Sequence, residues 1–179
     1  GTFTHNSGTV IFTSTGTATI TSGGSSFYVL TGNGAAGTLQ LNDNVTVITT
    51  LNMSNPNINL GTSTLTLGAS AAASTLTRTA GIMYNSAGGV FKRWIPSGLG
   101  ATDVDYDGTP ANNYGLYPMG ISSAYRPVEI RSSAAPTATG YISASHTDAQ
   151  TTTDVNGGTG YADNLGVTVY RVSDMKSTL

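Results

Sequence analysis

A single charged side chain, Asp43, occurs in the first 77 residues of this chain, which otherwise consist mainly of Thr, Ser, Gly, Asn and aliphatic residues. About a quarter of the residues of an ordinary soluble domain are charged, whereas 9% of this chain is charged. Disordered segments combine high net charge with few β-branched residues, but here the net charge is -2 and Thr, Val and Ile are abundant. The composition therefore favours a sheet with hydroxyl side chains outside and aliphatic side chains inside.

Short stretches in which Thr, Ser or Asn alternates with an apolar residue recur through the first 68 residues. They have the typical length of β-strands, and the Gly, Asn and Ser residues between them suit tight turns. The predicted strands are Gly8–Thr13, Thr17–Thr21, Ser26–Leu30, Gly37–Leu41, Asn44–Ile48, Pro56–Leu60 and Ser63–Leu67. The alternation predicts that the following side chains point inward: Val10, Phe12, Ile20, Val45, Val47, Leu65 and Leu67.

The composition changes after Arg78, where most of the charges and tyrosines and the only Trp lie. Strands are predicted at Gly89–Ile95, Leu116–Tyr117, Tyr125–Arg131, Thr139–His146 and Leu165–Val172, and proline residues interrupt them. No window has a helical period. The sequence therefore predicts an all-β chain with almost no helix. Residues 1–75 would form a short β-solenoid-like or stacked-strand repeat region, and residues 76–179 an antiparallel β-sandwich of jelly-roll type.

Several classes of protein are disfavoured by composition. Without cysteine the chain has no disulfide and no thiolate chemistry. The few, scattered Lys and Arg residues argue against nucleic acid, and no apolar run is long enough for a membrane span. His5, His146 and Glu129 are the only residues of their types, and no G-x-S-x-G motif occurs, so we expect no enzyme. The start at Gly1 without Met suggests a mature or trimmed product whose export signals, if any, have been removed.

The first 68 residues resemble the repeat region of secreted, adhesin-like surface proteins of Bacteroidota. The resemblance rests on Gly1–Asn6 (GTFTHN), Phe27–Leu30 (FYVL), Val45–Val47 (VTV) and Leu60–Gly68 (LGTSTLTLG). Further along, three segments are similar to short sequence motifs of the β-sandwich that follows such repeats: Phe91–Trp94 (FKRW), Leu116–Gly120 (LYPMG) and Tyr125–Val128 (YRPV). The resemblance implies a right-handed β-solenoid-like stack, an extracellular structural or adhesive role, and no catalytic motif.

The segment from Asp103 to Gly108 contains a candidate calcium site. Asp103, Asp105 and Asp107 alternate with other residues and precede Gly108, an arrangement that can gather hard oxygen ligands around one cation. The twelfth position of an EF-hand loop would carry Glu, however, and here it is Tyr114. A solvated acidic loop is the alternative, so calcium is an optional ligand and no cofactor is required.

Aromatic residues of the second half offer candidate contacts for a sugar ring. Trp94 follows Lys92 and Arg93, and Tyr117 and Tyr125 lie in the predicted strands that follow. The alternative is that these aromatic residues fill the core, where large rings usually pack.

Asn44 and Asn52 each begin an Asn-x-Ser/Thr triplet and are candidate glycosylation sites. Such triplets also arise by chance in a chain with so much Asn and Thr.

Together these features predict a secreted, extracellular or cell-surface structural protein, a subunit or segment of a bacterial filament or adhesin that binds copies of itself. The segment Gly1–Thr13 is the predicted contact, because it alternates, has no Pro or Lys to discourage strand pairing, and would bury Phe3, Val10 and Phe12 on assembly. The alternative function is a non-catalytic carbohydrate-binding module that binds surface glycans, with calcium as an optional ligand.

Overall fold

The computed structural model describes residues 3–69, 72–85, 87–100, 103, 113–130, 132, 134–147 and 166–171; of residues 147 and 166–171 it describes the backbone. The elements that it defines are β-strands, so the predicted all-β class is confirmed. Among the described residues no helix is long and apolar enough to cross a membrane.

The strands follow one another at short intervals. In the first part of the chain they are β1 (Thr9–Phe12), β2 (Thr17–Ile20), β3 (Ser26–Gly32), β4 (Thr38–Leu41), β5 (Val45–Met53), β6 (Asn57–Asn59), β7 (Thr64–Leu67), β8 (Thr75–Arg78), β9 (Met83–Tyr84) and β10 (Val90–Ile95). The later strands are β11 (Leu116–Tyr117), β12 (Gly120–Ile121), β13 (Ala124–Tyr125), β14 (Val128–Glu129), β15 (Gly140–Thr147) and β16 (Gly166–Arg171).

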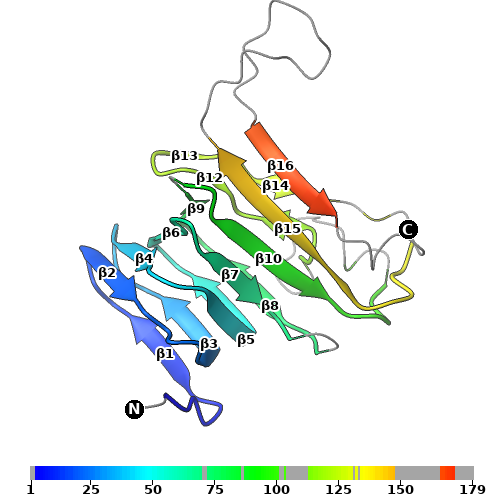
Figure 1. Ribbon diagram of the computed structural model, residues 1–179, viewed down its shortest axis with the longest axis horizontal. Coiled ribbons are helices and arrows are strands. Elements are labelled where there is room, and N and C mark those ends of the chain that lie inside the picture. The colour runs from blue at the N-terminus through cyan, green and yellow to red at the C-terminus, as the bar shows by residue number, and fades with distance from the viewer. Residues whose placement is uncertain are drawn as a thin grey trace, which may run out of the picture.

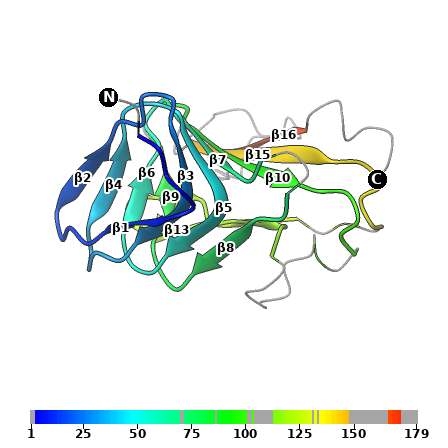
Figure 2. The same cartoon turned by 90° about the horizontal axis from the view of Figure 1, so that it is seen from below.

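Strands that are not consecutive in the chain pair in parallel, so the backbone winds as a β-solenoid. The larger sheet has the order β1-β3-β5-β7-β10-β15-β16, with β8 also paired to β5, and the smaller sheet has the order β2-β4-β6-β9 (Figure 1). Thr9 lies opposite Val29 and Thr17 opposite Thr38, so one coil takes roughly 20 residues, near the short end of solenoid repeats. Figure 2 shows β2, β4 and β6 side by side and apart from β3, β5 and β7.

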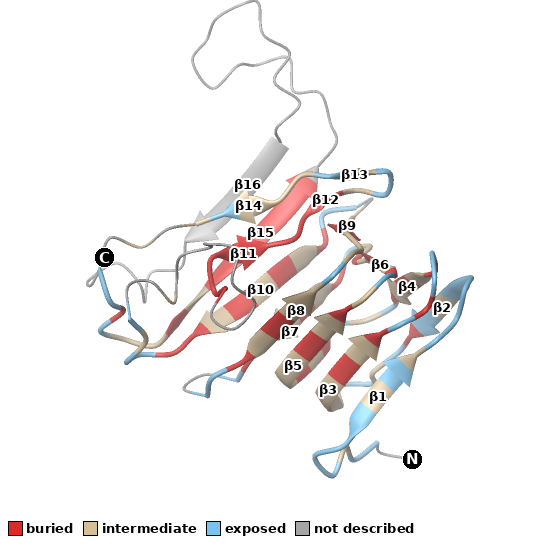
Figure 3. Cartoon of the chain, turned by 180° about the vertical axis from the view of Figure 1, so that it is seen from behind, coloured by how far each residue is buried: buried red, intermediate tan, exposed pale blue. Residues whose placement is uncertain are grey.

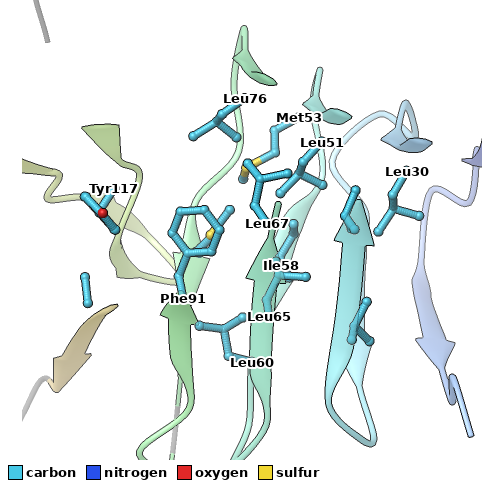
Figure 4. Close-up of a cluster of buried hydrophobic side chains, with 14 of the residues drawn as sticks. Leu30, Leu51, Met53, Ile58, Leu60, Leu65, Leu67, Leu76, Phe91 and Tyr117 are labelled. Atoms are coloured by element: carbon cyan, nitrogen blue, oxygen red, sulfur yellow. The ribbon is translucent and has the colours of Figure 1, made fainter. Parts of the chain in front are cut away.

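The core consists of rows of apolar side chains that stack from coil to coil. One row runs through Val10, Leu30, Leu51 and Leu76, as the strand registers show. Leucine and isoleucine side chains of both sheets meet in this interior, and Phe91 and Tyr117 extend it toward the later coils (Figure 4). All seven side chains that the alternation predicted to point inward belong to this core or pack against it, so that prediction is confirmed.

Polar side chains on the outside form a second set of contacts between neighbouring coils. Asn52 Nδ2 donates a hydrogen bond to Thr31 Oγ1 (3.0 Å), and Asn59 Nδ2 donates to Gln40 Oε1 (2.6 Å). These neutral groups satisfy one another from coil to coil, which explains how a nearly charge-free stretch presents a hydrogen-bonding surface.

Asp43, the only charged residue of the first 77, links two neighbouring coils through hydrogen bonds. Its carboxylate accepts hydrogen bonds from the backbone N–H groups of Ser22 (2.8 Å) and Gly23 (2.7 Å) in the preceding coil. The bond from Ser22 is the main cause of the lowered pKa of Asp43, since it stabilises the charged form.

The parallel stack continues beyond residue 75 and then gives way to antiparallel pairing. Strands β8, β9 and β10 pair in parallel with β5, β6 and β7, so the predicted division at residues 75 and 76 does not separate two sheets. Strand β15 then pairs antiparallel with β10, and two short antiparallel pairs, β11–β14 and β12–β13, follow the stack. The antiparallel strands predicted for residues 76–179 are therefore present, but β15 and β16 extend the solenoid's own sheet.

Candidate functional site

The N-terminal end of the solenoid is an open edge. Within the described part of the chain, β1 pairs only with β3 and β2 only with β4, so one side of each strand has no neighbour. Three inward-facing side chains at this end are only half-buried: Val10, Phe12 and Ala18. The side chains that lie next to them in the following coils are nearly all buried. Figure 3 shows this gradient, with exposed residues on β1 and β2 and buried ones along β3, β5 and β10.

The open side of β1 carries unpaired backbone groups. The carbonyls of Gly8 and Phe12 accept hydrogen bonds from residues in and just after β3 (3.4 and 2.8 Å). Because successive residues of a strand direct their backbone groups to opposite sides, the N–H and C=O groups of Thr9 and Ile11 point to the side without a partner strand.

Strand β2 repeats this arrangement. The carbonyls of Gly16 and Ile20 accept hydrogen bonds from residues in and just after β4 (3.1 and 2.9 Å). The backbone groups of Thr17 and Thr19 therefore also face the open side, and both edges of the coil can pair with another strand.

Features that usually protect a sheet edge are missing at this end. Residues 3–42 contain no Asp, Glu, Lys, Arg or Pro, and natural edges are commonly protected by such residues or by a covering segment. Ile11 is 56% exposed and Phe3 is 45% exposed, the largest exposures among the large hydrophobic side chains described. Phe3 nevertheless packs one side of its ring against Phe27, with 5.5 Å between centroids.

The opposite end of the stack is built differently. Strand β15 pairs antiparallel with β10 in the same sheet, and the short pairs β11–β14 and β12–β13 follow, with Pro118 and Pro127 beside them and Glu129 in β14. Met83 forms a bridge with Met119, so the smaller sheet meets this segment beyond β9.

An aromatic cluster on the outer face of β10 and β15 is the second candidate site. Phe91, Arg93 and Ile95 point into the core, so Lys92 and Trp94 point outward. The Trp94 ring meets Tyr141 edge-on at 5.2 Å, and Lys92 Nζ lies 3.8 Å from the Tyr141 ring centroid and 5.1 Å from that of Trp94. The sequence pointed to Trp94, but it gave no signal for its cross-strand partner Tyr141.

The other predicted glycan contacts lie apart from this cluster. Tyr117 is completely buried and packs against Phe91 at 5.6 Å, so it cannot stack on a sugar from solvent, and the core alternative holds for it. Burial raises the pKa of its hydroxyl, which is the expected effect of removing a phenolate from water. Tyr125 is 37% exposed, and the guanidinium of Arg78 lies over its ring at 3.6 Å.

The predicted calcium ligands are described only in part. Asp103 Oδ2 accepts a hydrogen bond from the backbone N–H of Gly100 (2.6 Å), whereas Asp105 and Asp107 lie outside the described residues. No group of three metal-ligating side chains gathers among the described residues, and calcium stays a prediction.

The two candidate glycosylation sites differ in their surroundings. Asn44 is exposed, and its Oδ1 accepts a hydrogen bond from the backbone N–H of Thr64 (2.8 Å). Asn52 is half-buried and uses its Nδ2, the atom that a glycan would modify, in the bond to Thr31. Asn44 is thus the more accessible of the two.

Arg93 is a buried residue, although its charge predicts exposure. It is 1% exposed and donates hydrogen bonds to the backbone carbonyl and Oδ1 of Asn113, while its guanidinium lies 4.5 Å from the ring of Tyr114. No carboxylate among the described residues pairs with it, and burial lowers its pKa to about 10. Arg93 therefore ties β10 to the segment that begins at Asn113.

Comparison with models of known protein families, with curated proteins and with solved structures finds no match for this chain.

Proposed function

We propose that this chain is an extracellular structural protein, a subunit or segment of a bacterial cell-surface filament or adhesin, and that it assembles through β-strand contacts at its N-terminal edge. One observation supports this proposal more than any other: within the described part of the chain β1 and β2 are open, uncharged edge strands, whereas the other end of the stack meets antiparallel strands. An edge of this kind is a template for pairing with another chain.

The proposed mechanism is mechanical. A strand placed beside β1 satisfies the backbone groups of Thr9 and Ile11 and completes the cover over Val10 and Phe12. Main-chain hydrogen bonds would supply most of the affinity, and the alternating side chains would fix the register. Rows of neutral hydroxyl and amide side chains link the coils on the outside. Because these groups also bind water, the surface of the solenoid needs few charges to remain hydrated.

The test compares the intact protein with variants of the edge in sedimentation velocity over a range of concentrations. Deletion of residues 1–13 should leave a folded protein that no longer associates. Val10→Lys should do the same, because its ammonium group reaches water at the open end of a single copy but would be buried in an assembly.

Thr46→Lys is the matched control, since this side chain points outward from β5, a strand with neighbours on both sides. It should associate as the natural protein does. Association that survives both edge changes, or an intact protein that stays monomeric at high concentration, would refute the proposal.

Carbohydrate binding is the second candidate function, and the cluster of Trp94, Tyr141 and Lys92 supports it. Aromatic rings can stack on the apolar face of a sugar, and the ammonium group of Lys92 favours an acidic sugar. Binding of uronic-acid oligosaccharides, measured by calorimetry with and without calcium, should be lost in Trp94→Ala and retained in Tyr125→Ala. Equal binding by both variants would exclude this cluster.

A further inference from the structure

We propose that the partner at the N-terminal edge is a second copy of this chain, related by a twofold axis that passes midway between the two Ile11 residues, so that β1 pairs antiparallel with the β1 of the other copy. This inference rests on the proposed function and specifies the arrangement of the contact. It is carried by the number of open edges at each end of the stack and by the direction of the backbone groups.

The N-terminal end offers two edges, one in each sheet, whereas the other end does not match it. Within the described residues the larger sheet ends at β16, but the smaller sheet passes from β9 to Met119 and the β12–β13 hairpin. A head-to-tail contact could therefore pair β1 with β16, but the four-residue β2 would face a hairpin whose strands are two residues long. A second N-terminal end presents the same two edges and can satisfy both.

Symmetry then decides the strand direction. If β1 is to pair with β1 and β2 with β2, with the apolar faces still inward, the axis must stand perpendicular to the sheets. Such a rotation reverses the strand direction, so the new pair is antiparallel. The contact is isologous, the commonest kind between identical subunits, and it closes at two copies, so a filament would need a second contact elsewhere on the chain. Antiparallel pairs are slightly more stable per residue than parallel ones.

The pairing register follows from the backbone groups that point outward. Residues opposite each other in a hydrogen-bonded antiparallel pair exchange both bonds, so Thr9, Ile11 and Thr13, whose groups face the open side by alternation, must lie opposite one another. Centring the axis on Ile11 places the two Ile11 side chains together and pairs Val10 with Phe12 of the other copy. This register covers the most exposed large aliphatic side chain, since Ile11 is 56% exposed.

Charge permits this contact between identical surfaces. Residues 3–42 carry no Asp, Glu, Lys or Arg, so two copies of the edge meet without like-charge repulsion. An oppositely charged partner would find no complementary group in this segment.

Single cysteines distinguish the arrangements, and the chain has no natural cysteine to interfere. Three variants, Thr9→Cys, Ile11→Cys and Thr13→Cys, are oxidised separately at a concentration at which the natural protein associates. Ile11→Cys should form a disulfide-linked dimer about tenfold faster than the other two, because opposite Cα atoms of a strand pair lie within disulfide range. A mixture of Thr9→Cys and Thr13→Cys should give a linked heterodimer, because these residues lie opposite each other in the proposed register.

Thr31→Cys, on the neighbouring strand, is the control and should not cross-link. Equal self-linking at residues 9, 11 and 13 would indicate parallel, in-register pairing and overturn the twofold arrangement. A protein that associates but links at none of them would also overturn it, while leaving the proposed function standing. A protein that does not associate would refute both.

Discussion

Truncation of Leu51 tests whether the aliphatic rows are the core of this solenoid. Leu51 lies between Leu30 and Leu76 in its row and is 1% exposed. Leu51→Ala removes three buried carbon atoms, worth about 2.4 kcal/mol at about 0.8 kcal/mol each. The cavity left behind raises the expected loss in the free energy of unfolding to about 3–4 kcal/mol.

The same row provides its own comparison at the open end. Val10 is half-buried, so Val10→Ala should cost only about 1 kcal/mol in a single copy, because fewer contacts are lost and no sealed cavity forms. Thr50→Ala, an outward-facing change beside Leu51, is the control and should stay within about 0.5 kcal/mol of the natural protein.

Equilibrium unfolding in urea, followed by circular dichroism and by the fluorescence of Trp94, measures these differences. It should be done at a concentration low enough to keep the protein monomeric. Equal losses for Leu51→Ala and Val10→Ala would contradict the assignment of β1 as an open edge. A loss below about 1 kcal/mol for Leu51→Ala would contradict the row as the core.

Three further predictions concern charged groups. Asp43 has a lowered pKa in the folded state, so its ionised carboxylate stabilises the fold above its ordinary pKa of 3.8. This contribution is lost as the pH falls through the lowered pKa, so the stability of Asp43→Asn should depend less on pH in this acid range. Arg93→Ala should lose about 3–5 kcal/mol in urea unfolding, because it leaves a cavity and an unpaired Oδ1 on Asn113. Arg93→Met should lose less, because it fills the space and removes a buried charge. If the loop from Asp103 to Asp107 binds calcium, calorimetry will give a heat that Asp105→Asn reduces; no heat and no shift in melting temperature leave a solvated loop.

The sequence was most informative where alternation and turn residues coincide. The predicted strands Gly89–Ile95 and Thr139–His146 agree with β10 and β15 to within one residue at each end. The strand predicted at Tyr125–Arg131 is not continuous in the structure. Strand β13 ends at Tyr125 and β14 begins at Val128, because Pro127 between them lacks the N–H that a continuous ladder needs. Local patterns therefore defined strands well but could not show which strands pair, since pairing joins residues a whole coil apart.

Two residues show why the site was harder to predict. Alternation in Val90–Ile95 placed Arg93 on the inward side with Phe91, but a charged residue is expected outside unless a partner is known. Its partner, Asn113, is distant in sequence and carries no charge. Tyr117 was similarly ambiguous, because a tyrosine suits both a core and a glycan contact, and only the packing against Phe91 assigns it to the core.

The most direct test of the central claim is hydrogen exchange of the β1 and β2 amides, measured by nuclear magnetic resonance at several protein concentrations. In a single copy the N–H groups of Thr9, Ile11, Thr17 and Thr19 face the open side and should exchange rapidly, while those of Val10 and Phe12 are protected by β3. At concentrations that favour association, the four open-side amides should become protected by about tenfold or more, because they then donate to the second copy. Association that leaves these four amides unprotected would place the contact elsewhere on the molecule and contradict the N-terminal edge as the site of assembly.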